Sequence, residues 1–372
     1  MLANSLSDQI LVEVLIFSDR NFVEVKSPTL LIRYFQSSSA LSFCERFIPR
    51  SLARIFLTSK ALLRYILISK CSLVHIHNTH PIQALCDVTR LCRVNKIPYV
   101  VSSHGFVETC NPADWLPGGF LNLLSYRVLV TNRLKACLKA ASSIFFTSTD
   151  EIALTSVLNI RHKPTYIVPN GFNPSCISPL PPSARNFSQQ FLQPGYTFLF
   201  VGNHTPNKGI DLLIKAISLS RVSWNLIIAG RIRDNSYLQD LCESYSVPFV
   251  GDRIYFTDYL SNEELLQAHN QSDAFVFPTR SDTFPLVVLD AMAMGLPIVS
   301  TYVGGIPSMV DRENGLLVQP NSVELAAAMD FLASNPAVSS SKGSASQKRA
   351  LTSFSWEHAA RKAIDGYLDI LS

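Results

Sequence analysis

Residues 273–318 read DAFVFPTRSDTFPLVVLDAMAMGLPIVSTYVGGIPSMVDRENGLLV. The apolar run AFVF predicts a buried strand that ends at a proline, and Pro285 suits the first turn of the helix that follows. Asp282 and Asp290 lie around this helix start, and a glycine pair follows the next apolar run. The stretch therefore predicts a strand, an acidic loop, a helix, a strand and a glycine turn, which together can bind hydroxyl groups and an anion.

The same pattern extends outward over the chain of 372 residues, because short apolar runs alternate with longer amphipathic ones. Alternation at this spacing predicts βαβ units and parallel sheets, and therefore an α/β protein. The segment Pro174–Gly195 is rich in Pro and Ser and predicts a linker. We expect one domain over residues 1–175 and a second over residues 176–355, followed by a last helix within residues 356–372.

The predicted strands are short. Those of the first half are Leu11–Phe17, Leu73–His77, Tyr99–Ser102, Ser143–Thr147 and Tyr166–Val168. Those of the second half are Thr197–Val201, Trp224–Ala229, Ile254–Thr257, Ala274–Phe277, Pro297–Ser300 and Gly315–Val318. A polar stretch over residues 339–347 precedes the last helix.

Charge is unevenly distributed along the chain. Residues 1–175 hold 18 Lys and Arg against 10 Asp and Glu, whereas residues 176–372 hold 14 against 18. A basic first half fits an anionic partner such as a membrane surface, a phosphorylated carrier or nucleic acid, but scattered solvated charge explains it equally well. The eight cysteines form no CxxC pair, so we expect buried thiols in a reducing compartment, without metal ligation or disulfides.

Residues 46–70 form a basic amphipathic stretch, in which Arg46, Arg50 and Arg54 are four residues apart with aliphatic residues between them. A helix of this kind can lie on an anionic bilayer, or it can be an ordinary packing helix with a basic outer face. No apolar run has the length of a membrane span, and the N-terminus lacks the basic region of a signal peptide. We therefore expect a cytoplasmic protein that can be peripheral at the inner face of a membrane.

Two further motifs place polar groups at strand ends. Residues 198–209, FLFVGNHTPNKG, lead from a strand through Gly202 to Lys208 at a helix start, where a lysine can contact a phosphate docked against backbone amides. Residues 101–106, VSSHGF, place His104 at the carboxyl end of a strand, where ligands bind in α/β proteins. A solvated lysine and a hydrogen-bonded core histidine are the alternatives.

The acidic loop offers acceptors and donors together. Asp282 lies at its mouth, and the N–H groups of Phe284, Leu286 and Val287 are placed to face a sugar or a phosphate. Asp290 lies in an otherwise apolar helix, where an unpartnered carboxylate is costly and a hydroxyl partner would remove the cost. An N-cap for the first acid and a surface position for the second are the alternatives.

In this order and spacing, the motifs resemble the retaining glycosyltransferases of family 4. The resemblance runs through VHIHNTHP, IPYVVSSHG, FTSTDE, IVPNGFN, FVGNHTPNKG, the Asp282-x7-Asp290 segment, VGGIPSMV and ENGLLV, and covers nearly the whole chain. It implies the GT-B fold, in which two Rossmann-like parallel-sheet domains face a cleft. It also implies that residues 176–355 bind the donor nucleotide-sugar, that residues 1–175 face the acceptor, and that the last helix crosses back to the first domain.

The resemblance also implies roles for single residues. Lys208 would contact the donor pyrophosphate, Asp282 the transferred sugar and Asp290 the ribose hydroxyls, while His104 would reach the sugar from the first domain. The implied catalytic residues are His104, Lys208 and Asp282. The implied donor-binding residues are Gly202, Asn203, Lys208, Asp282, Phe284, Leu286, Val287 and Asp290. The family transfers without a cofactor or a bound metal.

Three departures from the family pattern stand out. Its two glutamates are aspartates here, which shortens each side chain by one methylene. Its arginine after the phosphate-loop glycine is Asn203, so that Arg231 or Arg233 would have to supply the second cation. The family's first strand and glycine loop have no counterpart ahead of LANSLSDQILVEVLIF, which predicts a truncated chain or an internal start.

The predicted function is transfer of a sugar from a nucleotide-sugar donor to a glycan or lipid-linked acceptor, as in cell-envelope polysaccharide or glycolipid synthesis. Nucleic acid is not among the expected partners, whereas contact with an anionic membrane is. The alternatives are a truncated, non-catalytic remnant that binds nucleotide-sugars and a GT-B nucleotide-sugar epimerase.

Overall fold

The structure, a computed structural model, describes residues 1–39, 54–103, 124–153, 156, 163–178, 193–231, 235–247 and 253–372. It divides into two compact units. Unit 1 comprises Met1–Pro169 and Trp356–Ser372, and unit 2 comprises Asn170–Ser355. The division lies a few residues before the expected boundary at 175, because the short 3₁₀ helix η5 (Pro174–Ile177) packs against helix α13 of unit 2.

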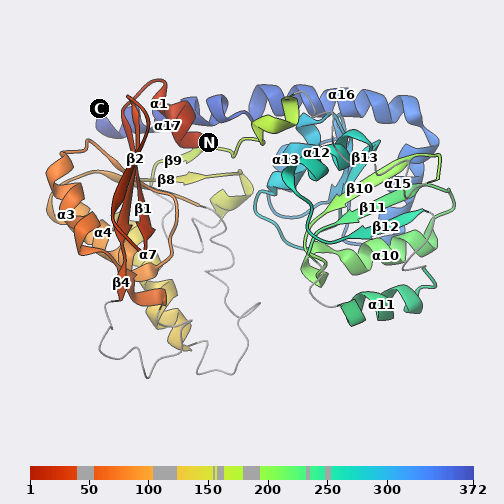
Figure 1. Cartoon of the computed structure of the whole chain (residues 1–372), viewed down its shortest axis with the longest axis horizontal. Helices are drawn as coiled ribbons and strands as arrows, with labels where there is room; N and C mark the ends of the chain where they lie inside the picture. Colours follow the sequence, from red (N-terminus) through yellow and green to blue (C-terminus); the bar gives the residue numbers. More distant parts are fainter. Residues whose placement is uncertain are drawn as a thin grey trace. The chain divides into compact units, whose positions relative to one another are not determined.

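Unit 2 contains a six-stranded, fully parallel sheet in the order β12-β11-β10-β13-β14-β15. Its strands are β10 (Thr197–Val201), β11 (Asn225–Ala229), β12 (Ile254–Thr257), β13 (Ala274–Phe277), β14 (Ile298–Thr301) and β15 (Gly315–Val318). Its helices are α10 (Ile210–Leu219), α11 (Asn235–Ser244), α12 (Asn262–Asn270), α13 (Leu286–Ala293), α14 (Ile306–Met309), α15 (Ser322–Ser334) and α16 (Pro336–Ser353). Figure 1 shows helices on both sides of this sheet. The six strands predicted for this half are confirmed.

The centre of the unit 2 sheet is aromatic. Phe198 and Phe200 of β10 and Phe275 and Phe277 of β13 are fully buried, and the rings of Phe200 and Phe277 lie 6.2 Å apart. Burial of such side chains supplies the main driving force for folding. The two central strands are therefore rigid supports for the loops at their carboxyl ends.

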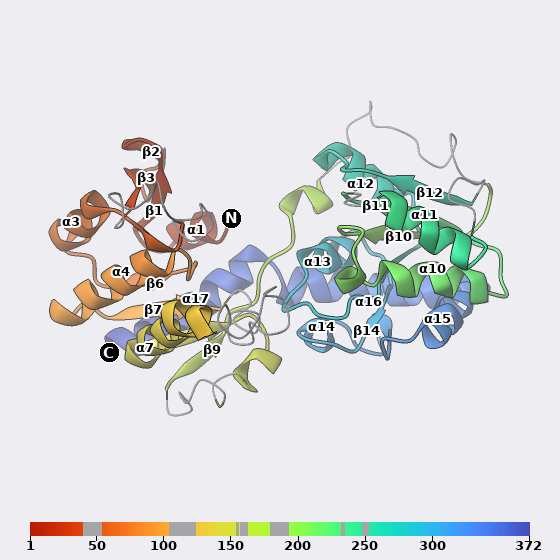
Figure 2. The ribbon, with the colours of Figure 1, turned by 90° about the horizontal axis from the view of Figure 1, so that it is seen from below.

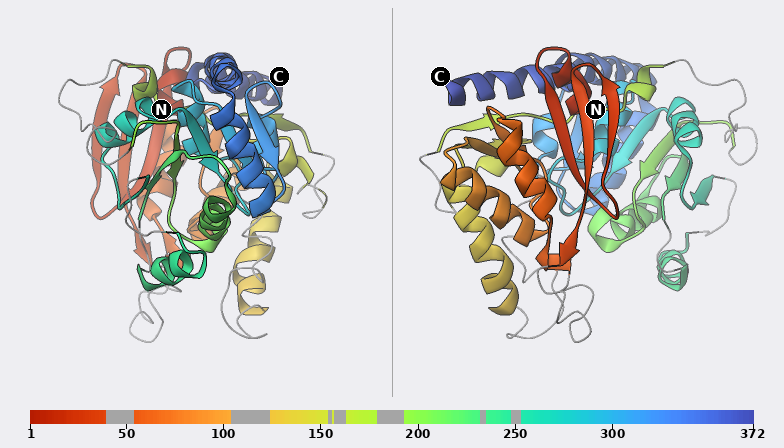
Figure 3. Two further views of the ribbon diagram at one scale, coloured as in Figure 1. Left: turned by 90° about the vertical axis from the view of Figure 1, so that its right-hand side faces the viewer. Right: turned by 60° about the vertical axis from the view of Figure 1, so that its left-hand side comes forward.

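Among the residues that the structure describes, unit 1 contains two larger sheets besides the two-stranded sheet of β4 (Ser38–Ser39) and β5 (Leu57–Thr58). The parallel sheet β6-β7-β8-β9 consists of Val74–Ile76, Tyr99–Ser102, Ser143–Phe146 and Thr165–Ile167. The other sheet has the order β1-β3-β2 and consists of Val12–Ser18, Leu30–Gln36 and Phe22–Ser27 (Figure 3). The predicted strand Leu11–Phe17 is confirmed as β1, whereas β2 and β3, which form an antiparallel hairpin, were not predicted. The residues of β2 are mostly exposed and include charges, so this strand leaves no buried apolar run in the sequence, and β3 is mostly half-buried.

Helix α17 (Trp356–Leu371) is part of unit 1 and packs against α1 (Leu2–Ser7) and β9. Its alanine face is buried, and a Cβ at Gly366 would come within 2.7 Å of the Phe145 ring. Tyr367 contacts His75 Nδ1 through its hydroxyl group, and His75 Nε2 lies 2.7 Å from Ser102 Oγ. A small-residue face therefore brings this helix close to the sheet.

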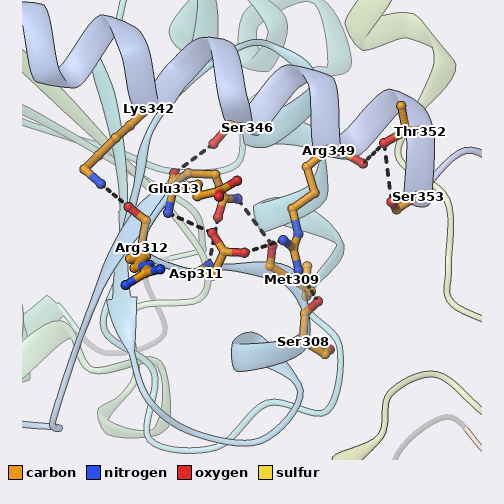
Figure 4. Close-up of polar contacts among 11 residues, drawn as sticks. Ser308, Met309, Asp311, Arg312, Glu313, Lys342, Ser346, Arg349, Thr352 and Ser353 are labelled. Atoms are coloured by element: carbon orange, nitrogen blue, oxygen red, sulfur yellow. Dashed lines mark hydrogen bonds and ion pairs between the residues drawn. The ribbon is translucent and has the colours of Figure 1, made fainter.

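The polar stretch 339–347 lies within α16, whose buried face carries small residues in place of large apolar ones. A Cβ at Gly343 would come within 2.2 Å of the carbonyl oxygen of Gly295, so α16 packs closely on the end of α13. Polar contacts then hold α16 on the α14–β15 loop (Figure 4). Arg349 forms a 2.5 Å ion pair with Asp311, and Ser346 donates a 2.9 Å hydrogen bond to the carbonyl group of Asn314.

A single helix over residues 46–70 is contradicted in the part of this stretch that the structure describes, which begins at residue 54. Strand β5 (Leu57–Thr58) pairs with β4 (Ser38–Ser39), and helix α3 begins only at Lys60 and ends at Ser69. Ser59 caps α3 by accepting the N–H of Leu62, which fixes its start. Membrane contact of this segment stays a prediction. None of the described helices combines the length and the apolar character that crossing a bilayer requires.

Candidate functional site

The candidate site lies at the carboxyl ends of β10 and β13, the two central strands of unit 2. These strands are neighbours, but the chain continues from β10 to β11 on one side and from β13 to β14 on the other. Such a reversal of strand order opens a crevice between the loops, and open α/β sheets bind ligands there. The loops are residues 202–209 after β10 and residues 278–285 after β13.

The structure brings Lys208 and Asp282 together across this point. Lys208 Nζ lies 2.5 Å from Asp282 Oδ2, and it also lies 5.6 Å from the centre of the Phe277 ring. The side chains are 27% and 17% exposed, so the ion pair is shielded on one side but still accessible to a ligand. Two residues predicted separately for the site therefore form one charged pair.

The two loops are also joined through their backbones. Asn207 accepts hydrogen bonds from the Thr279 hydroxyl group at 3.0 Å and from the Arg280 N–H at 2.9 Å. The Arg280 guanidinium forms two hydrogen bonds to Asp211 at the start of α10. Bidentate pairs of this kind fix orientation as well as distance. Neither Arg280 nor Asp211 was predicted for the site, because nothing local in the sequence relates two residues so far apart.

The glycine pair predicted from the sequence supports the acidic loop. The N–H of Gly305 donates a 3.2 Å hydrogen bond to the carbonyl oxygen of Asp282. Gly304 has φ +52°, and a Cβ at this residue would come within 1.9 Å of the same oxygen. Only a glycine permits this approach, so the backbone at Asp282 is held in place by the turn after β14.

Asp290, on α13, has a protein partner. Its Oδ1 accepts a 2.7 Å hydrogen bond from the backbone N–H of Asn173. Burial raises the pKa of the Asp290 carboxyl group, and hydrogen bonds from Asn173 and from the Cys176 thiol act in the opposite direction. The hydrogen bond from the backbone N–H offsets the cost of burying the Asp290 carboxylate, so a ligand hydroxyl group is not required for that purpose. Contact with a ribose stays a prediction.

The other predicted donor-binding residues line the two loops. The ring of Phe284 is buried and packs against Phe354, the C-cap residue of α16, with 5.9 Å between ring centres. Leu286 and Val287 begin α13, where N–H groups have no acceptor within the helix. Gly202 and Asn203 follow β10, and Asn203 is exposed.

The sequence also pointed to His104 and to Arg231 or Arg233. His104 and Arg233 lie outside the described residues. Arg231 lies beside the loop of residues 202–209, because its carbonyl group accepts a 3.1 Å hydrogen bond from the N–H of His204. No cluster of three potential metal ligands occurs within the described ranges.

Sequence reasoning missed His204, which lies in the loop between Gly202 and Lys208. Its side chain is 2% exposed, between the rings of Phe200 and Phe256, and neither ring nitrogen has a hydrogen-bond partner among the described residues. Burial lowers the pKa of His204 to about 4. An apolar residue would fit these surroundings better, because a buried polar group without a partner is destabilising.

We expect stability to fall as the pH falls from about 6.5 towards 4. The unfolded chain binds a proton at His204 below about pH 6.5, whereas the folded chain binds it only near pH 4. Replacing His204 by leucine should raise the free energy of unfolding by about 2 kcal/mol at pH 5 and flatten its pH dependence. Urea unfolding at pH 5 and pH 7 measures both effects. An unchanged pH slope in His204→Leu would contradict the assignment.

Two sequence profiles match the chain. Residues 2–175 match the profile described as "Glycosyltransferase Family 4", and residues 195–335 match "Glycosyl transferases group 1". An uncharacterized glycosyltransferase of Methanocaldococcus jannaschii is 31% identical over 173 residues, which are 45% of this chain and 44% of that protein. The sulfoquinovosyl transferase of Arabidopsis thaliana is 42% identical over 97 residues, 25% of this chain and 18% of that protein. The matches thus span less than half the length of these relatives.

Solved structures match over a longer range. The sucrose-phosphate synthase of Thermosynechococcus elongatus has a TM-score of 0.74 at 20% identity, covering 99% of this chain and 91% of that one. The Anabaena protein HepE, in complex with UDP-glucose, has a TM-score of 0.65 at 17% identity, covering 96% of this chain and 99% of that one. At these identities the likeness concerns the fold.

Proposed function

The chain belongs to glycosyltransferase family 4 and has the GT-B fold, and from this we propose that it transfers a sugar from a nucleotide-sugar to a hydroxyl group of a glycan or lipid-linked acceptor. The ion pair of Lys208 and Asp282 carries the proposal. It combines a cation for a diphosphate with a carboxylate for sugar hydroxyl groups at the switch point of a parallel sheet.

A bound donor would separate this ion pair, because its diphosphate would bind Lys208 and its sugar would bind Asp282. The oxygens of the diphosphate carry more negative charge than one carboxylate, and they would bind Lys208. The diphosphate would also dock against the free N–H groups of Leu286 and Val287. Asp282 would then accept hydrogen bonds from hydroxyl groups of the sugar. The ion pair keeps both side chains near these positions before the donor arrives, so little reorganisation is needed.

The proposed reaction proceeds with retention of anomeric configuration. Negative charge develops on the leaving diphosphate, where Lys208 and the first turn of α13 stabilise it. The acceptor hydroxyl group attacks from the face that the diphosphate leaves, and a phosphate oxygen takes its proton. His104 contacts the sugar in this proposal, and neither a metal nor a cofactor takes part.

A donor screen tests the proposal. UDP-glucose comes first, because the Anabaena structures contain UDP and UDP-glucose, and GDP-, ADP- and CMP-sugars follow. At 100 times its dissociation constant, a bound donor should stabilise the protein by about 2.7 kcal/mol, a shift of several degrees in melting temperature. NMR of the product with an acceptor panel, in the presence of a chelator, then gives the anomeric configuration. No binding by any nucleotide-sugar would refute the proposal, and binding without transfer would favour a non-catalytic protein.

A further inference from the structure

A second site of distinct chemistry lies in unit 1, between helices α4 (Ile82–Val94) and α7 (Asn132–Ala140). The two helices pack side by side in Figures 1 and 2. An open pocket of about 530 Å³ lies between them, and its walls include three arginines and two cysteines. These are Arg90, Arg93, Arg133, Cys86 and Cys137. The pocket is distinct from the site at β10 and β13, which belongs to unit 2.

The two cysteines contact each other across the pocket wall. Cys137 Sγ lies 3.7 Å from Cys86 Sγ and also accepts a 3.3 Å hydrogen bond from the Thr89 hydroxyl group. Both are free thiols, as are the other cysteines in the described part of the chain. Cys86 is half-buried and faces the pocket, whereas Cys137 is 6% exposed. An oxidant can therefore reach Cys86 first.

The surroundings of Cys86 favour its thiolate form, which is the reactive one. A hydrogen bond from Cys137 and then the charge of Arg133 lower the pKa of Cys86, although burial acts against them. Gln83, one turn earlier in α4, holds the Arg133 guanidinium through a 2.6 Å hydrogen bond. The cation is thus fixed beside the sulfur atom, and Arg90 and Arg93 extend the positive field over the pocket.

We propose that Cys86 and Cys137 form a reversible disulfide when the protein meets a hydroperoxide. The Cys86 thiolate attacks the outer peroxide oxygen and becomes a sulfenic acid, while the O–O bond breaks and the alkoxide leaves, or hydroxide in the case of hydrogen peroxide. The Cys137 sulfur then attacks the sulfenic sulfur, and its proton and the sulfenic hydroxyl group leave as water. Two electrons pass from the two thiols to the peroxide, and a dithiol reductant returns them. To form the bond, the sulfurs must approach from 3.7 Å to about 2.05 Å.

The test uses the full-length protein, reduced, desalted and treated with hydrogen peroxide before the free thiols are alkylated. Trypsin places Cys86 in the peptide 71–90, together with Cys71, and Cys137 in the peptide 136–139. We expect these peptides to be linked, with a mass lower by two hydrogen atoms, and to separate again on reduction. Cys86→Ser and Cys137→Ser should each abolish the link. The matched control Cys71→Ser, on the same peptide as Cys86, should retain it.

Two further measurements separate a built site from chance oxidation. Arg133→Gln should slow alkylation of Cys86 several-fold, whereas Arg133→Lys should keep most of the rate, because a cation remains beside the sulfur. The link should form at a lower peroxide concentration in the folded chain than in the chain unfolded by urea. Three results would each overturn the proposal: sulfinic acid on Cys86 with Cys137 still alkylated, a link to Cys92 in place of Cys137, or equal linking in folded and unfolded chains.

Discussion

Replacing Lys208 by alanine should lower kcat/KM for sugar transfer by about 10²–10³-fold. The substitution removes a cation that lies 2.5 Å from Asp282, at the position where the leaving diphosphate gains charge. It also leaves the Asp282 carboxylate without its counter-ion, so that it repels the donor phosphates. Steady-state kinetics with the donor identified by the screen measures the loss.

Lys215→Ala is the matched control for this result. Lys215 lies on α10, a short distance along the chain from Lys208, and its side chain is exposed. We expect it to keep parental activity. The double variant Lys208→Ala/Asp282→Asn should bind the nucleotide diphosphate more tightly than Lys208→Ala alone, because the repulsion is removed. Activity within threefold of the parent in Lys208→Ala would show that the pair has no part in catalysis.

Replacing Gly304 by alanine should lower the free energy of unfolding by about 3 kcal/mol, part from the left-handed backbone and part from overlap. Gly304 has φ +52°, and the new Cβ would meet the Asp282 carbonyl oxygen at 1.9 Å. The turn after β14 must therefore move away from the acidic loop. Chemical denaturation gives the loss of stability, and calorimetry with the nucleotide gives the accompanying loss of donor affinity.

Gly295→Ala separates the two causes. Gly295 also has a left-handed backbone, with φ +79°, but the nearest atom to a Cβ there is 3.8 Å away in the side chain of Gln347. It should cost only about 1 kcal/mol and leave donor binding unchanged. Equal losses in the two variants would mean that backbone conformation, without overlap, explains the effect, and that Gly304 does not position Asp282.

Unit 2 could be predicted from the sequence because its inner strands β11, β13 and β14 are fully buried and β10 nearly so. Strands such as β13 are continuous apolar runs, and Gly202, Gly230 and Pro278 mark where the loops after β10, β11 and β13 begin. The same rule missed β2, whose residues are mostly exposed, and β3, whose residues are mostly half-buried, and it gave no sign that the polar residues of α16 form a helix. Patterns of apolar residues report burial, and small or half-exposed elements bury too little to leave such a pattern.

The chemistry of the site was predictable only in part. Lys208 and Asp282 were each recognisable from local motifs, but 74 residues separate them, and only the order of strands brings them into contact. Asp290 was expected to need a ligand because its actual partner could not be recognised in the sequence. That partner is the backbone N–H of Asn173, a group that nearly any residue type would supply. Distant pairings of this kind depend on topology and register, which composition and spacing do not encode.

The place of α17 has a consequence for biosynthesis. Its buried face, with Ala359, Ala363 and Tyr367, completes an apolar cluster with Phe145 and Val168 of unit 1. The ribosome makes α17 after all the rest of unit 1 and after the whole of unit 2. The apolar cluster of unit 1 therefore stays incomplete and exposed to water during synthesis, while unit 2 can already fold. Chaperones that recognise exposed apolar surface could bind unit 1 during that interval, until α17 leaves the ribosome and covers the surface.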